Sequence, residues 1–158
     1  MTNVLVVRAN NRPDGISTKM YETFIAEAAT VEGLNVSTFD VFEENLAYFG
    51  QELFNAFGKL QNGEALTAAE QASFDSMNKA RAALDAAEVV VFAFPLWNQT
   101  IPAALQSFID YTYGAGYSFK YNEQGQLVSL MTDKKFIVLN ARGGNYSNPA
   151  MSSMEMAV

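Results

Sequence analysis

Hydrophobic residues follow two patterns that alternate along this chain. Strand-like runs, mostly apolar and rich in β-branched residues, occur at 4–7, 36–41, 89–94 and 136–140. Between the runs, apolar residues recur every three or four positions, which is the spacing of a helix that packs on a sheet by one face. Runs buried on both faces are typical of parallel strands covered by helices. The pattern therefore predicts an α/β fold in which helices cover both faces of a doubly wound parallel sheet.

Three helices are predicted between these strands. The first covers 20–28, the second begins at Thr67 and continues to residue 87, and the third follows Pro102. Thr67 and Glu70 have the spacing of a capping box, in which the hydroxyl accepts an amide of the first turn and the carboxylate reaches back. Proline is tolerated at a helix start because its missing amide hydrogen is not needed there. The predicted order is strand, helix, strand, insert, helix, strand, helix, strand.

Three segments depart from this alternation. Residues 43–66 are too apolar for a solvated loop, so short helical turns are expected, either as a satellite core or as a pocket wall or subunit contact. Residues 117–121 and 127–130 flank a turn and predict a hairpin. Residues 149–158 look like the first turns of another helix. Doubly wound domains of this type normally close with a fifth strand and a final helix, so these two elements are expected to be lacking or supplied elsewhere.

Composition and charge narrow the function classes. The chain has 158 residues, is 49% hydrophobic and carries a net charge of −7. These values fit a single domain over 1–158 and argue against a nucleic-acid partner, which needs clustered cations. The acidity indicates either solubility or docking to a basic redox partner.

Cysteine and histidine are both absent, which excludes disulfide, thiolate, histidine-triad and zinc chemistry. No apolar stretch is long enough to span a membrane, and the N-terminus lacks a signal-peptide pattern. A cytoplasmic protein without a membrane partner or a bound metal is therefore expected.

The loop after the first strand, residues 10–18, is a candidate anion site. It leads into a helix whose predicted start carries the hydroxyls of Ser17 and Thr18, and free amides at a helix start attract anions. The loop has neither the Walker lysine nor a G-x-G-x-x-G sequence. A mononucleotide phosphate therefore fits better than a nucleoside triphosphate or a dinucleotide. The alternative is that Ser17 only caps the helix.

The ends of the third and fourth strands present a flat aromatic ring, amides and glycine backbone. Trp97 and two amide residues follow Pro95, and Arg142 lies in the Asn-Ala-Arg-Gly-Gly segment at 140–144. Ligands of open α/β sheets bind beyond the carboxyl ends of the strands. These groups suit a planar, hydrogen-bonding ring better than a hydrolytic reaction, although Trp97 could instead belong to the core. Both strand ends together with the first loop are a stronger signal than any one of them.

Three of the segments carry a family resemblance. They are Pro95-Leu-Trp-Asn-Gln-Thr-Ile-Pro-Ala-Ala-Leu105, Gly114-Ala-Gly-Tyr-Ser-Phe-Lys-Tyr121 and Asn140-Ala-Arg-Gly-Gly144. Together with residues 4–13 they resemble the signature segments of the FMN-dependent NADH azoreductases, which are flavodoxin-like NAD(P)H:quinone oxidoreductases. The resemblance covers essentially the whole chain and implies a flavodoxin-like α/β/α domain in three layers. Members of that family continue further, with a last strand and helix.

The resemblance also implies which residues bind the flavin. Its phosphate is expected on Asn10, Ser17 and Thr18. Its isoalloxazine ring is expected against Pro95, Leu96, Trp97, Asn98 and Gln99, with Asn140, Ala141, Arg142, Gly143 and Gly144 along the other edges. Tyr121 resembles the family's substrate-side aromatic residue. Family members place the flavin at a dimer interface, so a homodimer is expected in which the partner subunit completes each pocket.

The implied reaction needs no catalytic side chain, because the chemistry takes place at N5 of the FMN. NADH or NADPH is expected to pass a hydride to the flavin and leave, after which a quinone or azo compound is reduced by two electrons in a ping-pong cycle. The main alternative is a flavodoxin-like electron carrier that docks a protein redox partner. A third reading is a non-catalytic remnant that binds no flavin. The sequence leaves open the choice between NADH and NADPH and the physiological acceptor.

Overall fold

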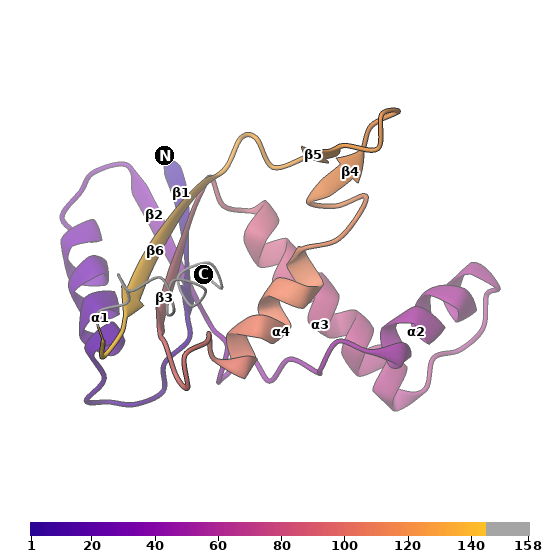
Figure 1. Cartoon of the computed structure of the whole chain (residues 1–158), viewed down its shortest axis with the longest axis horizontal. Helices are drawn as coiled ribbons and strands as arrows, with labels where there is room; N and C mark the ends of the chain where they lie inside the picture. Colours follow the sequence, from indigo (N-terminus) through magenta and orange to yellow (C-terminus); the bar gives the residue numbers. More distant parts are fainter. Residues whose placement is uncertain (145–158) are drawn as a thin grey trace.

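The core of the molecule is a parallel sheet. The computed structural model describes residues 1–144. Within them β1 (Thr2–Arg8), β2 (Leu34–Asp40), β3 (Val89–Pro95) and β6 (Lys135–Ala141) form a four-stranded sheet in the order β2-β1-β3-β6 (Figure 1). All four strands were predicted, and their ends differ from the predicted runs by at most two residues. The order confirms the doubly wound topology, because the winding direction reverses between β1 and β3.

Helices cover both faces of the sheet, as predicted (Figure 1). On one face α1 (Ile16–Ala28) packs Phe24 and its neighbours against the alternate side chains of β1 and β3. On the other face lie α3 (Ala68–Asp85) and α4 (Ala103–Thr112), whose Phe108 is fully buried in the larger core. Each central strand is therefore apolar on both sides, which explains its continuous hydrophobic run.

The segment before α3 is more regular than its sequence suggested. The prediction of short helical turns was too modest, because α2 (Gln51–Gln61) is one continuous helix of eleven residues. It packs on α3, away from the sheet (Figure 1). The capping box of α3 is confirmed: the Glu70 N–H donates to Thr67 Oγ1 over 3.3 Å, and the Thr67 N–H donates to Glu70 Oε2 over 2.7 Å.

Strand β6 departs from expectation. Its apolar run was predicted to be buried on both faces, but Phe136, Ile137 and Val138 are 51%, 43% and 48% exposed in the described part of the chain. The reason is position: within residues 1–144, β6 pairs with β3 alone, and only Leu139 near its end joins the core under α1. A continuous apolar run in the sequence indicates that a strand suits a buried position, but it does not identify the element that would bury it.

The predicted hairpin is formed by β4 (Phe119–Tyr121) and β5 (Leu127–Ser129). It projects from the end of the molecule at which β3 and β6 begin (Figure 1). At its base the Tyr117 hydroxyl donates to Asp85 Oδ1, at the end of α3, over 2.7 Å. Lys134 Nζ donates to a backbone carbonyl just before β3 over 2.7 Å. The hairpin is thus held at the amino-terminal edge of the sheet.

The helical turns predicted at 149–158 lie outside the described residues. Among residues 1–144, none of the helices has the length and apolar character needed to cross a membrane.

Candidate functional site

The three predicted junctions meet at the carboxyl ends of β1, β3 and β6. The Ala9 N–H donates to the Ala93 carbonyl over 2.9 Å, and the Leu96 N–H donates to the Ala141 carbonyl over 2.9 Å. The segments that leave three neighbouring strands therefore stay side by side. A cavity of about 470 Å³ lies there, between the strands at which the winding reverses, where open α/β sheets bind their ligands. Its volume is that of a small-molecule site.

Most of the predicted flavin-binding residues line this cavity. They are Asn10, Ser17, Pro95, Leu96, Trp97, Asn140, Ala141, Arg142 and Gly143. Four more lining residues were missed: Arg12, Gly15, Ile16 and Met20. All four belong to the first loop and the first turns of α1, so the signal that selected this loop could have included them. Thr18, Asn98, Gln99 and Gly144 were predicted and are not among the lining residues.

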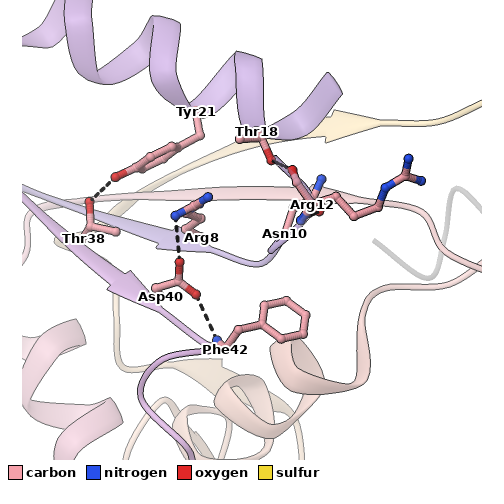
Figure 2. A network of polar contacts seen from close by, with 8 residues as sticks. All are labelled: Arg8, Asn10, Arg12, Thr18, Tyr21, Thr38, Asp40 and Phe42. Atoms are coloured by element: carbon pink, nitrogen blue, oxygen red, sulfur yellow. Dashed lines mark hydrogen bonds and ion pairs between the residues drawn. The ribbon is translucent and has the colours of Figure 1, made fainter. Parts of the chain in front are cut away.

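The first loop is organised around a buried amide. Asn10 donates from Nδ2 to Ser17 Oγ over 2.7 Å, and its Oδ1 accepts the Arg12 N–H over 2.9 Å. Thr18 donates its hydroxyl to the Arg12 carbonyl over 2.8 Å, which ties α1 to the loop (Figure 2). Ser17 is not the helix cap, because α1 begins at Ile16 and is preceded by a glycine without a capping side chain. The helix-cap interpretation of Ser17 is therefore wrong.

Gly15 matters because it lacks a side chain. Its φ of −68° is ordinary for any residue, so no backbone strain requires glycine. A Cβ at this position would instead collide with Nδ2 of Asn10 and lie 3.2 Å from the Arg12 carbonyl. The loop can close on the Asn10 side chain only because that volume is empty. Gly15, Ile16 and Ser17 line the cavity at the start of α1, which is the positive end of the helix dipole.

The second junction contains a strained turn. The Trp97 N–H donates to the Thr100 carbonyl over 3.0 Å, and the reverse bond measures 3.1 Å. Between them Asn98 and Gln99 have φ values of 52° and 68°, the left-handed conformations of a two-residue hairpin turn. Non-glycine residues adopt such conformations at a cost and concentrate at functional sites. Trp97 is half-buried beside this turn, so it is a wall of the cavity rather than a core residue.

The third junction is held in register with the second. Asn140 donates from Nδ2 to the Phe94 carbonyl over 3.2 Å, which fixes its side chain across the end of β3. Ala141 pairs with Pro95, and Arg142 and Gly143 follow into the cavity wall. Within the described residues the lining includes Arg12 and Arg142 and no carboxylate.

The charge and shape of the cavity suit a phosphate-bearing planar ligand. Two arginines and a helix start along its lining favour an anionic ligand, and the Trp97 ring with neighbouring backbone offers a flat surface. Arg12 also contacts Asp14, at 3.1 Å, and lowers the pKa of that carboxyl group by its hydrogen bond and its charge. Asp14 therefore stays ionised and partly offsets the Arg12 charge at the solvent side.

A larger groove of about 850 Å³ also borders Trp97. Its lining residues come from the segment 41–48, which follows β2, from 97–102, and from the first two turns of α4. Arg8 and Asp40 form an ion pair of 3.0 Å, and Asp40 Oδ1 accepts the Phe42 N–H over 3.0 Å, so the start of the 41–48 wall is fixed to β1 (Figure 2). Residues 43–66 were expected to form either a satellite core or a pocket wall or subunit contact. Leu46 and Leu53 pack in the main core rather than in a separate one, and Leu46 also lines the groove, so the pocket wall is the alternative that the structure supports.

Asn98 and Tyr121 are placed apart from the smaller cavity. Asn98 lines the larger groove beside Trp97. Tyr121 is 62% exposed on the hairpin, at the end of the sheet opposite the three junctions (Figure 1). This chain therefore does not bring Tyr121 to its own cavity.

Comparison with known proteins identifies the family. A family model described as "Flavodoxin-like fold" matches residues 2–158. The chain is 46% identical to an FMN-dependent NADH:quinone oxidoreductase of Brevibacillus brevis, over 99% of this chain and 76% of that protein. It is 43% identical to FMN-dependent NADH:quinone oxidoreductase 3 of Bacillus thuringiensis, over 100% of this chain and 77% of that protein.

Solved structures agree with these relatives. A crystal structure of an azoreductase from Bacillus anthracis superposes with a TM-score of 0.86 at 42% identity, and the match covers 99% of this chain and 76% of that one. The chain thus spans about three quarters of the length of the proteins that it matches. The chain belongs to the flavodoxin-like family of FMN-dependent NADH:quinone oxidoreductases and azoreductases.

Proposed function

We propose that this chain is a single flavodoxin-like domain that binds FMN and uses NADH or NADPH to reduce quinones and azo compounds by two electrons. The observation that carries the proposal is the cavity at the reversal between β1 and β3, which is lined by the start of α1, two arginines and Trp97. The names of the relatives, which are FMN-dependent NADH:quinone oxidoreductases and an azoreductase, support the same reaction.

Different residues would bind different parts of the FMN. Ser17 and the first amides of α1 would hold the phosphate, with Asn10 as the group that positions Ser17. Trp97, Leu96 and the backbone of 140–143 would hold the ring. Thr18 would contribute by fixing the loop rather than by touching the phosphate, since its hydroxyl is bonded to the Arg12 carbonyl. Asn98, Gln99 and Gly144 remain proposed ring contacts through the turn and strand end that carry them.

The chain itself supplies binding and electrostatics. FMN, when bound, supplies the transfer of two electrons between a nicotinamide and an acceptor. Backbone N–H groups of the turn at 97–100 and of the glycines after β6 would stabilise negative charge on the ring.

We further propose that NADH and the acceptor occupy the same face in turn. Steady-state rates measured against both substrates should then give parallel double-reciprocal lines, the sign of a ping-pong cycle. Intersecting lines would contradict a shared face. Because nicotinamide coenzymes work inside the cell, we place the activity in the cytoplasm.

The proposed assembly is a homodimer. Its support is the hairpin, whose Tyr121 is exposed and lies at the far end from its own cavity. The tyrosine can act as a substrate-side aromatic residue only in the cavity of a partner subunit. Exposed aromatic side chains on and before α2, among them Phe54 and Phe57, offer an apolar surface for the contact.

The test combines binding and turnover. The purified chain should carry a flavin absorption band or bind added FMN in titration calorimetry, and the loaded protein should oxidise NADH in the presence of a simple quinone. An electron carrier would bind FMN, consume little NADH and accumulate a one-electron form during anaerobic titration. A folded chain that gives no heat with FMN would refute the proposal.

A further inference from the structure

Asp40 is a buried carboxylate at the carboxyl end of β2, and it does not line the cavity proposed to bind FMN. Its Oδ2 pairs with Nη1 of Arg8 over 3.0 Å, directly opposite on β1 (Figure 2). The Arg8 guanidinium also lies 5.1 Å from the centre of the Tyr21 ring on α1. The cation is therefore held by a carboxylate and by the face of an aromatic ring, so the Asp40 side chain is fixed to two neighbouring elements.

Asp40 also organises the backbone that follows β2. Its second carboxylate oxygen, Oδ1, accepts the Phe42 N–H over 3.0 Å, the bond of an Asx turn (Figure 2). Its main-chain carbonyl accepts the N–H groups of Glu43 and Glu44, each over 3.0 Å. Three successive amides therefore donate to this one residue. The place at which the chain leaves the sheet, and with it the backbone of Phe42, is set by Asp40.

Phe42 connects this turn to Trp97. The two ring centres are 6.1 Å apart and the ring planes are inclined by 53°, which is within the range of attractive aromatic pairs. Phe42 is partly buried against the main core and also lines the larger groove. Because part of the side chain borders the groove, the position of the ring depends on its backbone as well as on packing.

Trp97 depends on such a contact more than a core residue would. It is half-buried and borders both the smaller cavity and the larger groove. A side chain that borders two hollows is packed on fewer sides than a core side chain. The contact with the Phe42 ring is therefore expected to restrict the orientation of the indole.

We propose that Asp40 is a positioning residue for the FMN site. Held by Arg8, it fixes the backbone of Phe42, and the Phe42 ring in turn holds the Trp97 indole where it borders the cavity. The inference rests on the proposed function and deepens it, because a displaced indole would offer the flavin ring a poorer flat surface. Asp40 itself touches neither the flavin nor a substrate and acts only through these two side chains.

The test uses the fluorescence of Trp97, which is the only tryptophan of the chain. Asp40→Ala removes both the partner of Arg8 and the acceptor of the Phe42 N–H. In the protein without FMN, it should shift the emission to longer wavelength and make the indole easier to quench with acrylamide. The dissociation constant for added FMN should rise by roughly two- to tenfold, the range expected when one aromatic contact is weakened.

Two further variants separate the steps. Asp40→Asn keeps an oxygen that can accept the Phe42 N–H, so it should restore much of the native emission. If Asp40→Asn is no closer to the native protein than Asp40→Ala, the bond to Phe42 is not the link and the inference fails. Phe42→Leu leaves the Arg8–Asp40 pair in place but removes the ring contact, so it should reproduce the effects of Asp40→Ala on both emission and FMN binding.

The matched control is Thr38→Val. Thr38 lies two residues earlier on β2, and its hydroxyl is 3.0 Å from the Tyr21 hydroxyl (Figure 2). The substitution breaks a neighbouring hydrogen bond, keeps the shape of the side chain and leaves Phe42 untouched. It should change neither the emission nor the FMN dissociation constant. An effect as large as that of Asp40→Ala would show that general loosening of the strand ends is the cause, and the inference would fail.

The inference and the proposed function fail in different ways. Native emission in Asp40→Ala and in Phe42→Leu refutes the positioning role even if FMN binds. A native protein that binds no FMN refutes the proposed function, and the emission of the FMN-free variants still decides whether Asp40 positions the indole. Circular dichroism confirms that each variant is folded. If Asp40→Ala does not fold, Phe42→Leu provides the decisive comparison, and native emission in that variant refutes the inference.

Discussion

At the scale of single residues, the turn between Trp97 and Thr100 shows how the site is shaped by unfavourable local conformation. Asparagine tolerates the left-handed region, whereas glutamine has no such preference, yet Gln99 adopts a φ of 68°. The turn persists because two backbone hydrogen bonds close it on both sides. The site therefore stores strain at the residue that was expected to face the flavin ring.

Replacing Gln99 by glycine should stabilise the protein. Relief of the left-handed conformation is worth roughly 1–2 kcal/mol, and the greater freedom of glycine in the unfolded chain takes back roughly 0.5–1 kcal/mol. The net gain in the free energy of unfolding should be about 0–1.5 kcal/mol, measured by urea denaturation without FMN. Gln99→Ala keeps the strained conformation and serves as the control. A glycine variant no more stable than the alanine variant would show that the turn is unstrained.

Gly15 gives a second prediction at this scale. Gly15→Ala should displace the Asn10 side chain and with it the hydrogen bond to Ser17. A lost buried hydrogen bond at the phosphate end should raise the FMN dissociation constant by roughly tenfold or more. Gly58→Ala is the control: Gly58 lies within α2 with no atom near its missing Cβ, so it should leave FMN binding unchanged and add about 0.5–1 kcal/mol of stability. Titration calorimetry with FMN measures the dissociation constant of each variant.

Residue types were easier to predict than their roles. The hydroxyls of Ser17 and Thr18 could be selected from the sequence because they lie at a predicted helix start, and the indole of Trp97 because it follows an apolar run. That Ser17 receives the Asn10 amide, while Thr18 holds a loop carbonyl, depends on how the loop closes. The same holds for Gly15, whose importance lies in the position of a side chain five residues earlier.

At the scale of elements, local signals were the most reliable. The capping box of α3 is set by residues three apart, so it could be identified without tertiary information. The exposure of β6 and the continuity of α2 depend on which other elements pack on them. Hydrophobic periodicity along the sequence does not contain this information. The hairpin shows the same limit. Its strands were predicted, but its attachment through Tyr117 to Asp85 was not.

That attachment is insensitive to pH in the neutral range. Burial and the Asp85 carboxylate raise the pKa of Tyr117 above its usual value, so its hydroxyl stays protonated and continues to donate. Arg81 stacks on the Tyr117 ring at 4.2 Å and donates from Nε to the Tyr111 carbonyl over 3.0 Å at the end of α4. The base of the hairpin is thereby joined to two helices.

Helix α3 should be the acid-sensitive element. The Lys59 ammonium and the Thr67 amide lower the pKa of Glu70 in the folded protein. Its stabilising contribution is therefore complete above the unfolded value of about 4.3 and is lost as the pH falls through the lower, folded value. Glu70→Gln should reduce the fall in urea midpoint between pH 6 and pH 3. An unchanged fall would assign the acid sensitivity to other carboxylates.

Thr67→Ala, which removes the capping hydroxyl of α3, should lower the free energy of unfolding by about 1 kcal/mol at neutral pH.

At the scale of the whole molecule, several of the exposed aromatic residues belong to one region, α2 and the segment before it. Tyr48, Phe54 and Phe57 are 81%, 55% and 36% exposed, on and just before the helix that lies farthest from the sheet (Figure 1). Scattered exposed apolar residues are normal, but a group of large aromatic rings is typical of an interaction surface. In the proposed homodimer, these three aromatic residues would contact the partner subunit.

Phe54→Glu should weaken self-association. A carboxylate in an apolar contact loses its hydration without compensation, so sedimentation at micromolar concentration should shift towards the monomer. Val31→Glu is the control. It adds the same negative charge as Phe54→Glu, and Val31 is 53% exposed in the turn between α1 and β2. If neither variant changes the sedimentation of a dimeric native protein, α2 is not the contact.

The separation between the hairpin and its own cavity has a consequence for mixtures of damaged chains. If each hairpin serves the opposite subunit, a protein with a spoiled cavity still carries a sound Tyr121, and a protein without Tyr121 still carries a sound cavity. Two inactive versions, exchanged into one another, would then rebuild one working centre in every mixed pair. Recovery of turnover on blending would reveal sharing between subunits that neither inactive preparation could disclose alone.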